Sequence, residues 1–243
     1  MGKILVLVEV QNSRVRKASL SGVTFAADLA GRTSGTFDIA VMGPGARAAA
    51  PSLAGFGAGK VHVLESPGLS SYLARPWAGA AASMVEAVGA DCLVAVSTTW
   101  TRDMLPRVAA RLGAGMVSEA VGIDGSGSDV MFRRPMWAGN VIATVRVKTP
   151  RCVICVRGTE FSPAEPSGGS SPVVELAVDV AADPAARHVS FEPTVSERPD
   201  LAEADVVVSG GRGLGDKASF WNTLNPLADY LGAAIGATRA VVD

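Results

Sequence analysis

The sequence predicts an α/β fold: a three-layer N-terminal domain built on a parallel sheet, an antiparallel extension, and the start of a second α/β unit. From residue 3 to about 113, short β-branched runs alternate with Ala-rich segments of helical length, which is typical of βαβ units. After Gly115 the apolar runs are short and separated by Gly, Ser and Pro turns, which indicates antiparallel strands. Near Asp205 a new apolar run enters a glycine-rich turn.

The N-terminal domain is expected to alternate strands and helices. The expected strands are Ile4 to Val8, Phe37 to Met42, Val61 to Leu64 and Cys92 to Val96. The expected helices are Ser19 to Arg32, Ala46 to Phe56 and Ser70 to Val88. A further helix is expected to have Thr101 as its N-cap and to end at Gly113, because Met104, Leu105, Val108, Ala109 and Leu112 form one apolar stripe.

Four short strands are expected after Gly115 to form the antiparallel extension: Met116 to Ile123, Val130 to Arg134, Val141 to Val147 and Cys152 to Val156. Residues 162–172 are rich in Ser, Pro and Gly, which predicts a loop or linker. A polar stretch with prolines follows, and we place the domain boundary near residue 195. The first domain is thus residues 1–195, and the incomplete second domain is residues 196–243.

Composition excludes several classes of function. With 22 Lys+Arg against 23 Asp+Glu, the net charge is −1, so no global field attracts nucleic acid or anionic lipid. The apolar run Ile4 to Val8 is too short for a membrane span, and no small-residue cleavage site follows it. We therefore expect a cytoplasmic protein with no nucleic-acid partner and no membrane insertion.

The cysteines and histidines do not predict a metal or catalytic site. Cys152 and Cys155 have the spacing of a zinc or redox pair, but they lie in a predicted strand, where residues three apart face opposite ways. We interpret them as small buried hydrophobic residues. Neither His62 nor His188 has a neighbouring Ser/His/Asp or Glu/His constellation.

Two loops of the first domain leave alternatives open. The loop from Ser97 to Asp103 could bind an anion at a helix N-terminus, but capping by Thr101, with Asp103 on the helix dipole, is the favoured interpretation. The hairpin from Met131 to Asn140 carries arginines and aromatic residues. A subunit interface is favoured there over a nucleic-acid surface, because two arginines are few.

Three polar side chains define the candidate site of the second unit. Arg212 lies in the glycine turn after the strand at Val206 to Val208, and Thr238 and Arg239 enter the next expected strand after a helix from about Ala218 to Leu231. Open α/β sheets bind ligands at the carboxyl ends of such strands. The turn fits neither GxGxxG nor a Walker A loop, since Ala218 follows Lys217. Read alone, it could be an ordinary strand-to-helix turn.

Longer motifs add a resemblance that covers the whole chain. They are Ile4-Leu-Val-Leu-Val-Glu9 with Arg16-Lys-Ala-Ser-Leu20, Pro106-Arg-Val-Ala-Ala-Arg-Leu-Gly-Ala-Gly115, Arg134-Pro-Met-Trp-Ala-Gly-Asn140, Thr144-Val-Arg-Val-Lys-Thr-Pro150, and the two segments Val206 to Gly213 and Gly236 to Asp243. Together they resemble the α subunit of electron transfer flavoprotein. The resemblance implies that the second unit opens a Rossmann-like FAD domain.

The resemblance also implies a function and a set of roles. The chain would be an electron carrier, not an enzyme, that pairs with a β subunit and works between flavin dehydrogenases and a quinone-linked or other acceptor. Arg212 would contact the FAD phosphate or ring region, and Thr238 and Arg239 would lie at the isoalloxazine. A fixed cation there favours negatively charged reduced flavin. The family's AMP site lies on the β subunit, so none is assigned here.

The family sequence continues beyond Asp243 with segments that hold most of the FAD, so a complete FAD site is expected to need residues past Asp243. The alternative is a flavin-free nucleotide-binding or interaction module of the universal stress or adenine nucleotide hydrolase-like type. The sequence disfavours it, because neither Glu9 to Ser13 nor Val96 to Thr99 contains a phosphate-binding glycine motif.

Overall fold

The computed structural model describes residues 2–192, 198–201 and 204–242. The chain folds into two compact units, with the division between His188 and Val189. The boundary predicted at residue 195 lies outside the described residues. Within the described part of the chain, none of the helices is both long and apolar enough to cross a membrane.

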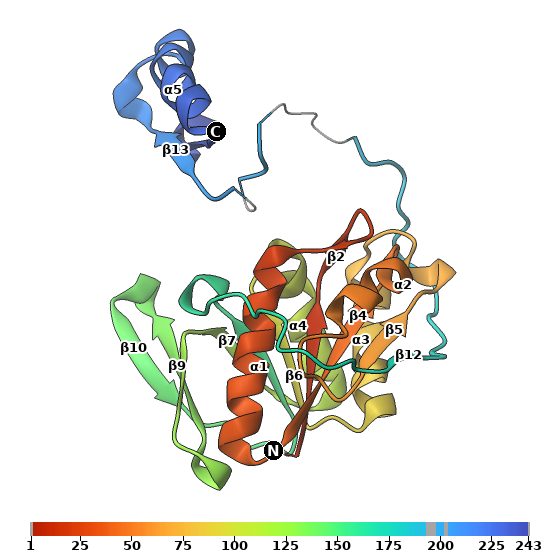
Figure 1. Ribbon diagram of the computed structural model, residues 1–243. Helices are drawn as coiled ribbons and strands as arrows, with labels where there is room; N and C mark the ends of the chain where they lie inside the picture. Colours follow the sequence, from red (N-terminus) through yellow and green to blue (C-terminus); the bar gives the residue numbers. More distant parts are fainter. Residues whose placement is uncertain (1, 193–197, 202–203, 243) are drawn as a thin grey trace. The chain divides into compact units, whose positions relative to one another are not determined.

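The first unit is built on a seven-stranded sheet in which all paired strands are parallel (Figure 1). Across the sheet, the strands are β12 (Val173–Glu175), β5 (Val61–Leu64), β4 (Thr36–Met42), β1 (Lys3–Val8), β6 (Cys92–Val96), β11 (Cys152–Val156) and β7 (Gly115–Ala120). The strand order reverses at β1, because β4 lies on one side of it and β6 on the other. Such a reversal is the usual place for a ligand crevice.

Helices cover both faces of this sheet, which confirms the three-layer prediction. Residues of α1 (Leu20–Thr33) and α2 (Ala46–Ala49) share a core with Ile4, Val6 and Val8. Residues of α3 (Ala74–Val88) and α4 (Thr99–Leu112) share the opposite core with Leu5 and Leu7. Because strand side chains alternate, the continuous apolar run of β1 supplies both cores.

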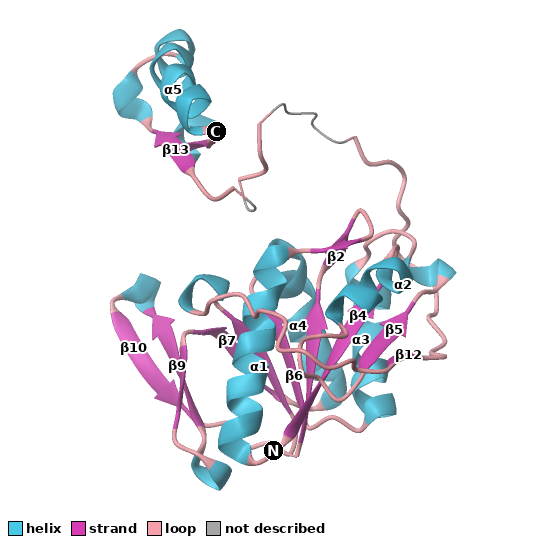
Figure 2. Ribbon diagram, viewed as in Figure 1, coloured by secondary structure: helices cyan, strands magenta, loops and turns pink. Residues whose placement is uncertain are grey.

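A three-stranded antiparallel sheet extends this unit (Figure 2). It contains β8 (Gly122–Asp124), β9 (Met131–Met136) and β10 (Val141–Val145), in the order β10-β9-β8. Phe132 of β9 is fully buried, and its ring centroid lies 6.2 Å from that of Phe25 in α1. The antiparallel sheet therefore shares the core on the α1 side of the parallel sheet.

The prediction that Cys152 to Val156 belongs to the antiparallel extension was wrong. This strand, β11, lies between β6 and β7 in the parallel sheet, and Cys152 pairs in register with Cys92. All five of its residues are buried, as expected for a strand covered on both faces. The segment expected as one strand from Met116 to Ile123 is divided between β7 and β8. The edge strand β12, which follows the predicted loop, was not expected.

Three helix boundaries differ from the prediction by more than one residue. Helix α3 begins at Ala74 instead of Ser70, and α2 gives way after Ala49 to a 3₁₀ turn, Ala50–Leu53, which contains Pro51. Proline lacks the N–H that an α-helix needs at that position. The N-cap of α4 is Thr98, not Thr101.

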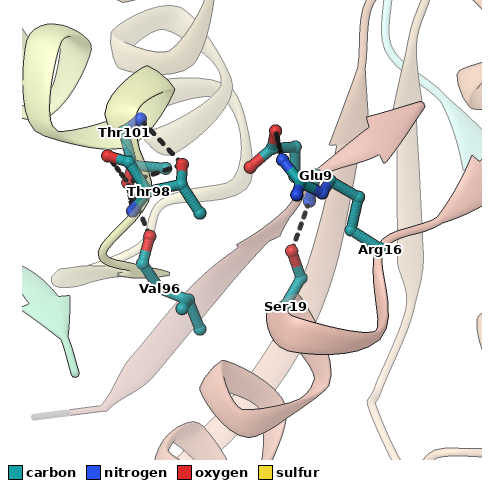
Figure 3. A network of polar contacts seen from close by, with 6 residues as sticks. All are labelled: Glu9, Arg16, Ser19, Val96, Thr98 and Thr101. Atoms are coloured by element: carbon teal, nitrogen blue, oxygen red, sulfur yellow. Dashed lines mark hydrogen bonds and ion pairs between the residues drawn. The ribbon is translucent and has the colours of Figure 1, made fainter. Parts of the chain in front are cut away.

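Thr98 and Thr101 form a reciprocal capping box (Figure 3). The Thr101 N–H donates to Thr98 Oγ1 at 3.2 Å, and the Thr98 N–H donates to Thr101 Oγ1 at 2.8 Å. The Thr101 hydroxyl also donates to the Val96 carbonyl at 2.5 Å, which ties the helix start to the end of β6. Thr101 therefore serves as the third helical residue of the box and reaches back to the cap.

Thr98→Ala is expected to lower the free energy of unfolding by about 1 kcal/mol, because the Thr101 N–H loses its hydrogen bond to the Thr98 hydroxyl. Thr99→Ala, at the exposed first residue of the same helix, is the matched control. Urea denaturation followed by circular dichroism measures both. Equal stability of the two variants would contradict the capping role.

A buried polar cluster joins β1, β4 and β5. Asp38 accepts a hydrogen bond from His62 Nε2 at 2.8 Å. It also forms an ion pair with Lys3, whose Nζ lies 3.0 Å from the same carboxylate oxygen. The Lys60 N–H donates to its second oxygen at 3.0 Å. Burial raises the pKa of Asp38, but the hydrogen bonds from His62 and Lys3 outweigh it and hold the pKa below the usual 3.8. His62 is thus a buried residue that is bonded to Asp38.

Because the folded state favours ionised Asp38, its contribution to stability is present above pH 3.8 and is lost as pH falls through the lower folded pKa. Asp38→Asn is expected to cost about 1–3 kcal/mol at pH 7, since Lys3 and His62 lose a charged partner. It should also flatten the fall in stability between about pH 5 and 3. Asp28→Asn, in the exposed pair with Arg32, is the control. The free energy of unfolding is measured by urea denaturation at several pH values. If it falls as steeply between about pH 5 and 3 in Asp38→Asn as in the unaltered protein, Asp38 does not have this role.

Candidate functional site

The second unit is a small parallel β-α-β arrangement followed by one helical turn. Strand β13 (Val207–Gly210) leads into a 3₁₀ turn (Arg212–Leu214) and then α5 (Lys217–Leu231). Strand β14 (Ala234–Ala237) follows, and then α6 (Arg239–Val242). Phe220, Leu224 and Ala228 of α5 are buried. These are the positions that make up one helical face.

Glycine at position 210 permits the tight turn at the end of β13. A Cβ there would lie 2.5 Å from Leu214 Cδ1 and 2.8 Å from Phe220 Cε2. The turn therefore folds back on the strand end, and α5 packs directly on it. Gly215, which precedes the helix cap, has φ +82°, a conformation that favours glycine.

The carboxyl ends of the two strands meet at this turn. Gly210 pairs with Ala237, and the Thr238 N–H donates to the Gly210 carbonyl at 3.0 Å. A Cβ on Gly211 would lie 3.4 Å from Thr238 Oγ1, so the Thr238 side chain stands beside the glycine turn. The structure thus brings Thr238 next to the turn that carries Arg212.

The expectation that Thr238 and Arg239 enter a strand was wrong. The strand β14 ends at Ala237, and Arg239 opens α6. The strand stops where its partner β13 stops, because no further backbone of β13 is available for pairing. The pair nevertheless lies at the carboxyl end of β14, as expected, which is the edge where ligands of parallel sheets bind.

A pocket of about 550 Å³ opens beside the turn. Arg212, Gly215, Lys217 and Trp221 are among its lining residues, whereas Thr238 and Arg239 are not among those described. Arg212, Thr238 and Arg239 are all exposed. The three predicted residues therefore share one edge of the sheet but do not all line one cavity.

The sequence analysis did not identify Asp216 and Lys217 as site residues, although both line this pocket. Asp216 caps α5 by accepting a hydrogen bond from the Ser219 N–H at 2.8 Å, and hydrogen bonds from Ser219 lower the pKa of its carboxyl group. An Asp three residues before a Ser at a helix start is a capping signal that could have revealed it. Since Asp216 occupies the N-terminus of α5, an anion here would depend on side-chain cations instead.

The donors at this edge fit a flavin nucleotide. Two guanidinium groups and one hydroxyl stand at adjacent strand ends, and guanidinium groups pair well with phosphate and carbonyl oxygens. FAD offers both kinds of acceptor. The types of side chain present therefore match the acceptors of this cofactor.

In the first unit, Ser97 and Arg157 also follow two neighbouring strands, β6 and β11, but both of these side chains bond to Glu119. Thr98 and Thr101 use their hydroxyls in the capping box, which supports a capping role for the loop from Ser97 to Asp103. Asp103, which was expected on the helix dipole, lies beyond the first turn and accepts a hydrogen bond from Tyr72. Cys152 and Cys155 are buried in opposite cores of the sheet, as their strand spacing predicted. Across the part of the chain that the structure describes, no group of three His, Cys, Asp or Glu side chains could hold a metal ion.

Comparison with known proteins gives two family matches. The family described as "Electron transfer flavoprotein domain" matches residues 4–181, and the family described as "Electron transfer flavoprotein FAD-binding domain" matches residues 200–243. The matches cover both units.

Relatives from fungi and bacteria agree. The chain is 36% identical over 241 residues to the probable electron transfer flavoprotein subunit alpha, mitochondrial, of Cryptococcus neoformans, covering 98% of this chain and 68% of the relative. It is 37% identical to the electron transfer flavoprotein subunit alpha of Bradyrhizobium diazoefficiens, covering 98% and 73%. For the subunit alpha of Paracoccus denitrificans, identity is also 37%, with 99% and 74% covered. The chain belongs to the electron transfer flavoprotein α-subunit family.

Proposed function

We propose that this chain is the α subunit of an FAD-dependent electron carrier, one that takes electrons from flavin dehydrogenases and passes them to a quinone-linked or other acceptor. Its family consists of electron-transfer proteins, not enzymes. The observation that carries the proposal is the placement of Arg212, Thr238 and Arg239 at the carboxyl ends of β13 and β14, within the segment that matches the FAD-binding domain. The flavin-free nucleotide-binding alternative has no comparable support.

The three residues are assigned different roles. Arg212, on the turn after β13, would bind a phosphate or ring oxygen of FAD through its guanidinium group. Thr238 would orient the flavin by a hydrogen bond from its hydroxyl. Arg239 would place a fixed positive charge near the isoalloxazine, which stabilises added negative charge there. FAD itself supplies the redox chemistry.

A β subunit is the proposed partner, and the β9–β10 hairpin is its proposed contact surface. Four apolar side chains of the hairpin are exposed: Met136 by 40%, Trp137 by 78%, Val141 by 50% and Ile142 by 55%. Val141 pairs with Met136 across the hairpin, so these two side chains lie on one face of it, next to the turn that carries Trp137. An exposed aromatic anchor of this kind is typical of an interface.

The cytoplasmic location also stays a proposal. The name of the fungal relative includes "mitochondrial", whereas the names of the two bacterial relatives do not. Cell fractionation would decide between these locations.

The flavin site is tested in an α–β complex whose α chain includes the segment expected beyond Asp243 and to which FAD is added. Arg212→Ala is expected to weaken FAD binding about tenfold to a hundredfold, because a charge-assisted hydrogen bond is lost. Arg239→Ala is expected to lower the flavin midpoint potential by on the order of tens of millivolts, because a nearby positive charge is removed. Flavin fluorescence titration and spectroelectrochemistry measure the two effects.

Arg198→Ala is the control, since Arg198 is a cation of the same unit that pairs with Asp229 on α5. It should change neither FAD affinity nor potential. If Arg239→Ala leaves the potential where it was, Arg239 does not lie at the flavin.

The partner surface is tested by Trp137→Ala, which is expected to weaken association with the β subunit at least tenfold, because a central aromatic anchor is removed. Phe191→Ala, at an equally exposed aromatic outside the hairpin, is the control. Isothermal titration calorimetry measures both. Equal dissociation constants for the two variants would exclude the hairpin from the interface.

A further inference from the structure

The first unit has its own pocket at the point where the strand order reverses. Its volume is about 260 Å³, and its lining includes Glu9, Met42, Tyr72, Trp77 and Trp100. Glu9 directly follows β1, and Met42 ends β4, so the pocket lies at the carboxyl ends of two neighbouring strands. This is the position at which open α/β sheets bind ligands.

Three aromatic rings form one wall of this pocket. The ring centroids of Tyr72, Trp77 and Trp100 lie 5.4–6.2 Å apart in edge-to-face contacts. The Trp77 indole donates to the Ser71 carbonyl at 2.9 Å, which holds its ring in place. Gly43, with φ +91°, allows this packing, because a Cβ there would lie 2.2 Å from the Trp77 ring.

The hydroxyl group of Tyr72 is also hydrogen-bonded within the protein. Its hydroxyl donates to Asp103 Oδ2 at 2.8 Å, and burial together with this carboxylate raises the pKa of Tyr72. The phenol therefore stays neutral. The aromatic wall offers π surface, and the donors of Tyr72 and Trp77 are already used within the protein.

Glu9 is the acidic residue among the described lining of the pocket. Its Oε1 accepts from Arg16 at 2.9 Å, while its backbone N–H donates to Ser19 Oγ at 3.1 Å (Figure 3). Its Oε2 is buried and accepts no hydrogen bond from any residue that the structure describes. An unsatisfied buried carboxylate oxygen is costly, so a missing donor is expected there. No Lys, Arg or His is among the described lining residues.

We propose that this pocket binds an organic cation, an ammonium or guanidinium group on a short apolar stem. The cation would donate to Glu9 Oε2 in a charge-assisted hydrogen bond, while its stem and charge pack on the aromatic wall. The same features disfavour a phosphate. The cation comes either from a free amine or from a basic side chain of a partner protein. The proposal does not depend on the flavin site.

The test titrates the full chain with butylammonium chloride and follows the indole N–H signals of its four tryptophans by NMR. Trp77 and Trp100 are expected to shift saturably, whereas Trp137 and Trp221, which do not line this pocket, serve as internal references. Butanol, which has the same stem without the charge, should bind at least tenfold more weakly. Sodium chloride at equal ionic strength should have no saturable effect.

Glu9→Gln is expected to weaken butylammonium binding at least tenfold, and Asp28→Asn, in another ion pair, should leave it unchanged. Should Glu9→Gln unfold, Trp100→Leu provides a second variant that removes part of the aromatic wall. Equal binding of butanol, shifts at all four tryptophans, or no saturation would overturn the proposal.

Addition of the β subunit distinguishes the two sources. Competition between butylammonium and the β subunit, with the Trp77 and Trp100 signals moving on association, would assign the site to a basic side chain of the partner. Undisturbed butylammonium binding in the complex would assign it to a free amine.

Discussion

Burial of the central parallel strands on both faces is the constraint on which the first unit depends. Every residue of β6 and β11 is buried, as are the residues of β1 after Lys3. A strand of this kind needs a covering layer on each side, which α1 and α2 supply on one face and α3 and α4 on the other. Since each helix follows a strand, the strand-to-helix loops gather at one edge.

That edge carries two polar features of the first unit. Glu9 follows β1, and the capping box of Thr98 and Thr101 follows β6. The capping box uses its donors internally, whereas one oxygen of the Glu9 carboxylate is left without a donor among the described residues. The hydrophobic layers therefore bring a carboxylate and an aromatic wall together, although their residues are far apart in the chain.

The second unit also has parallel strands joined by a helix, and arginine side chains lie at the ends of its strands. Its strand-to-helix turn is tight because Gly210 leaves no room for a side chain, and Asp216 occupies the start of α5. The side-chain cations Arg212 and Arg239 then remain as the groups suited to an anionic ligand. The second unit thus has exposed arginines at its strand ends, whereas the described lining of the first unit's pocket contains the carboxylate of Glu9 and no Lys, Arg or His.

Apolar periodicity by itself determined most of the strands and helices, because a run such as Ile4 to Val8 can only be buried as a core strand. Glycine turns and motif residues likewise indicated Arg212, Thr238 and Arg239 as candidate site residues from the sequence alone. Tertiary structure decided which sheet β11 joins, since local sequence does not record the distant pairing with β6. It also decided that β14 ends before Thr238, where its partner strand ends, and that Tyr72, Trp77 and Trp100 meet near Glu9. These features depend on contacts between residues remote in the chain, which no local pattern encodes.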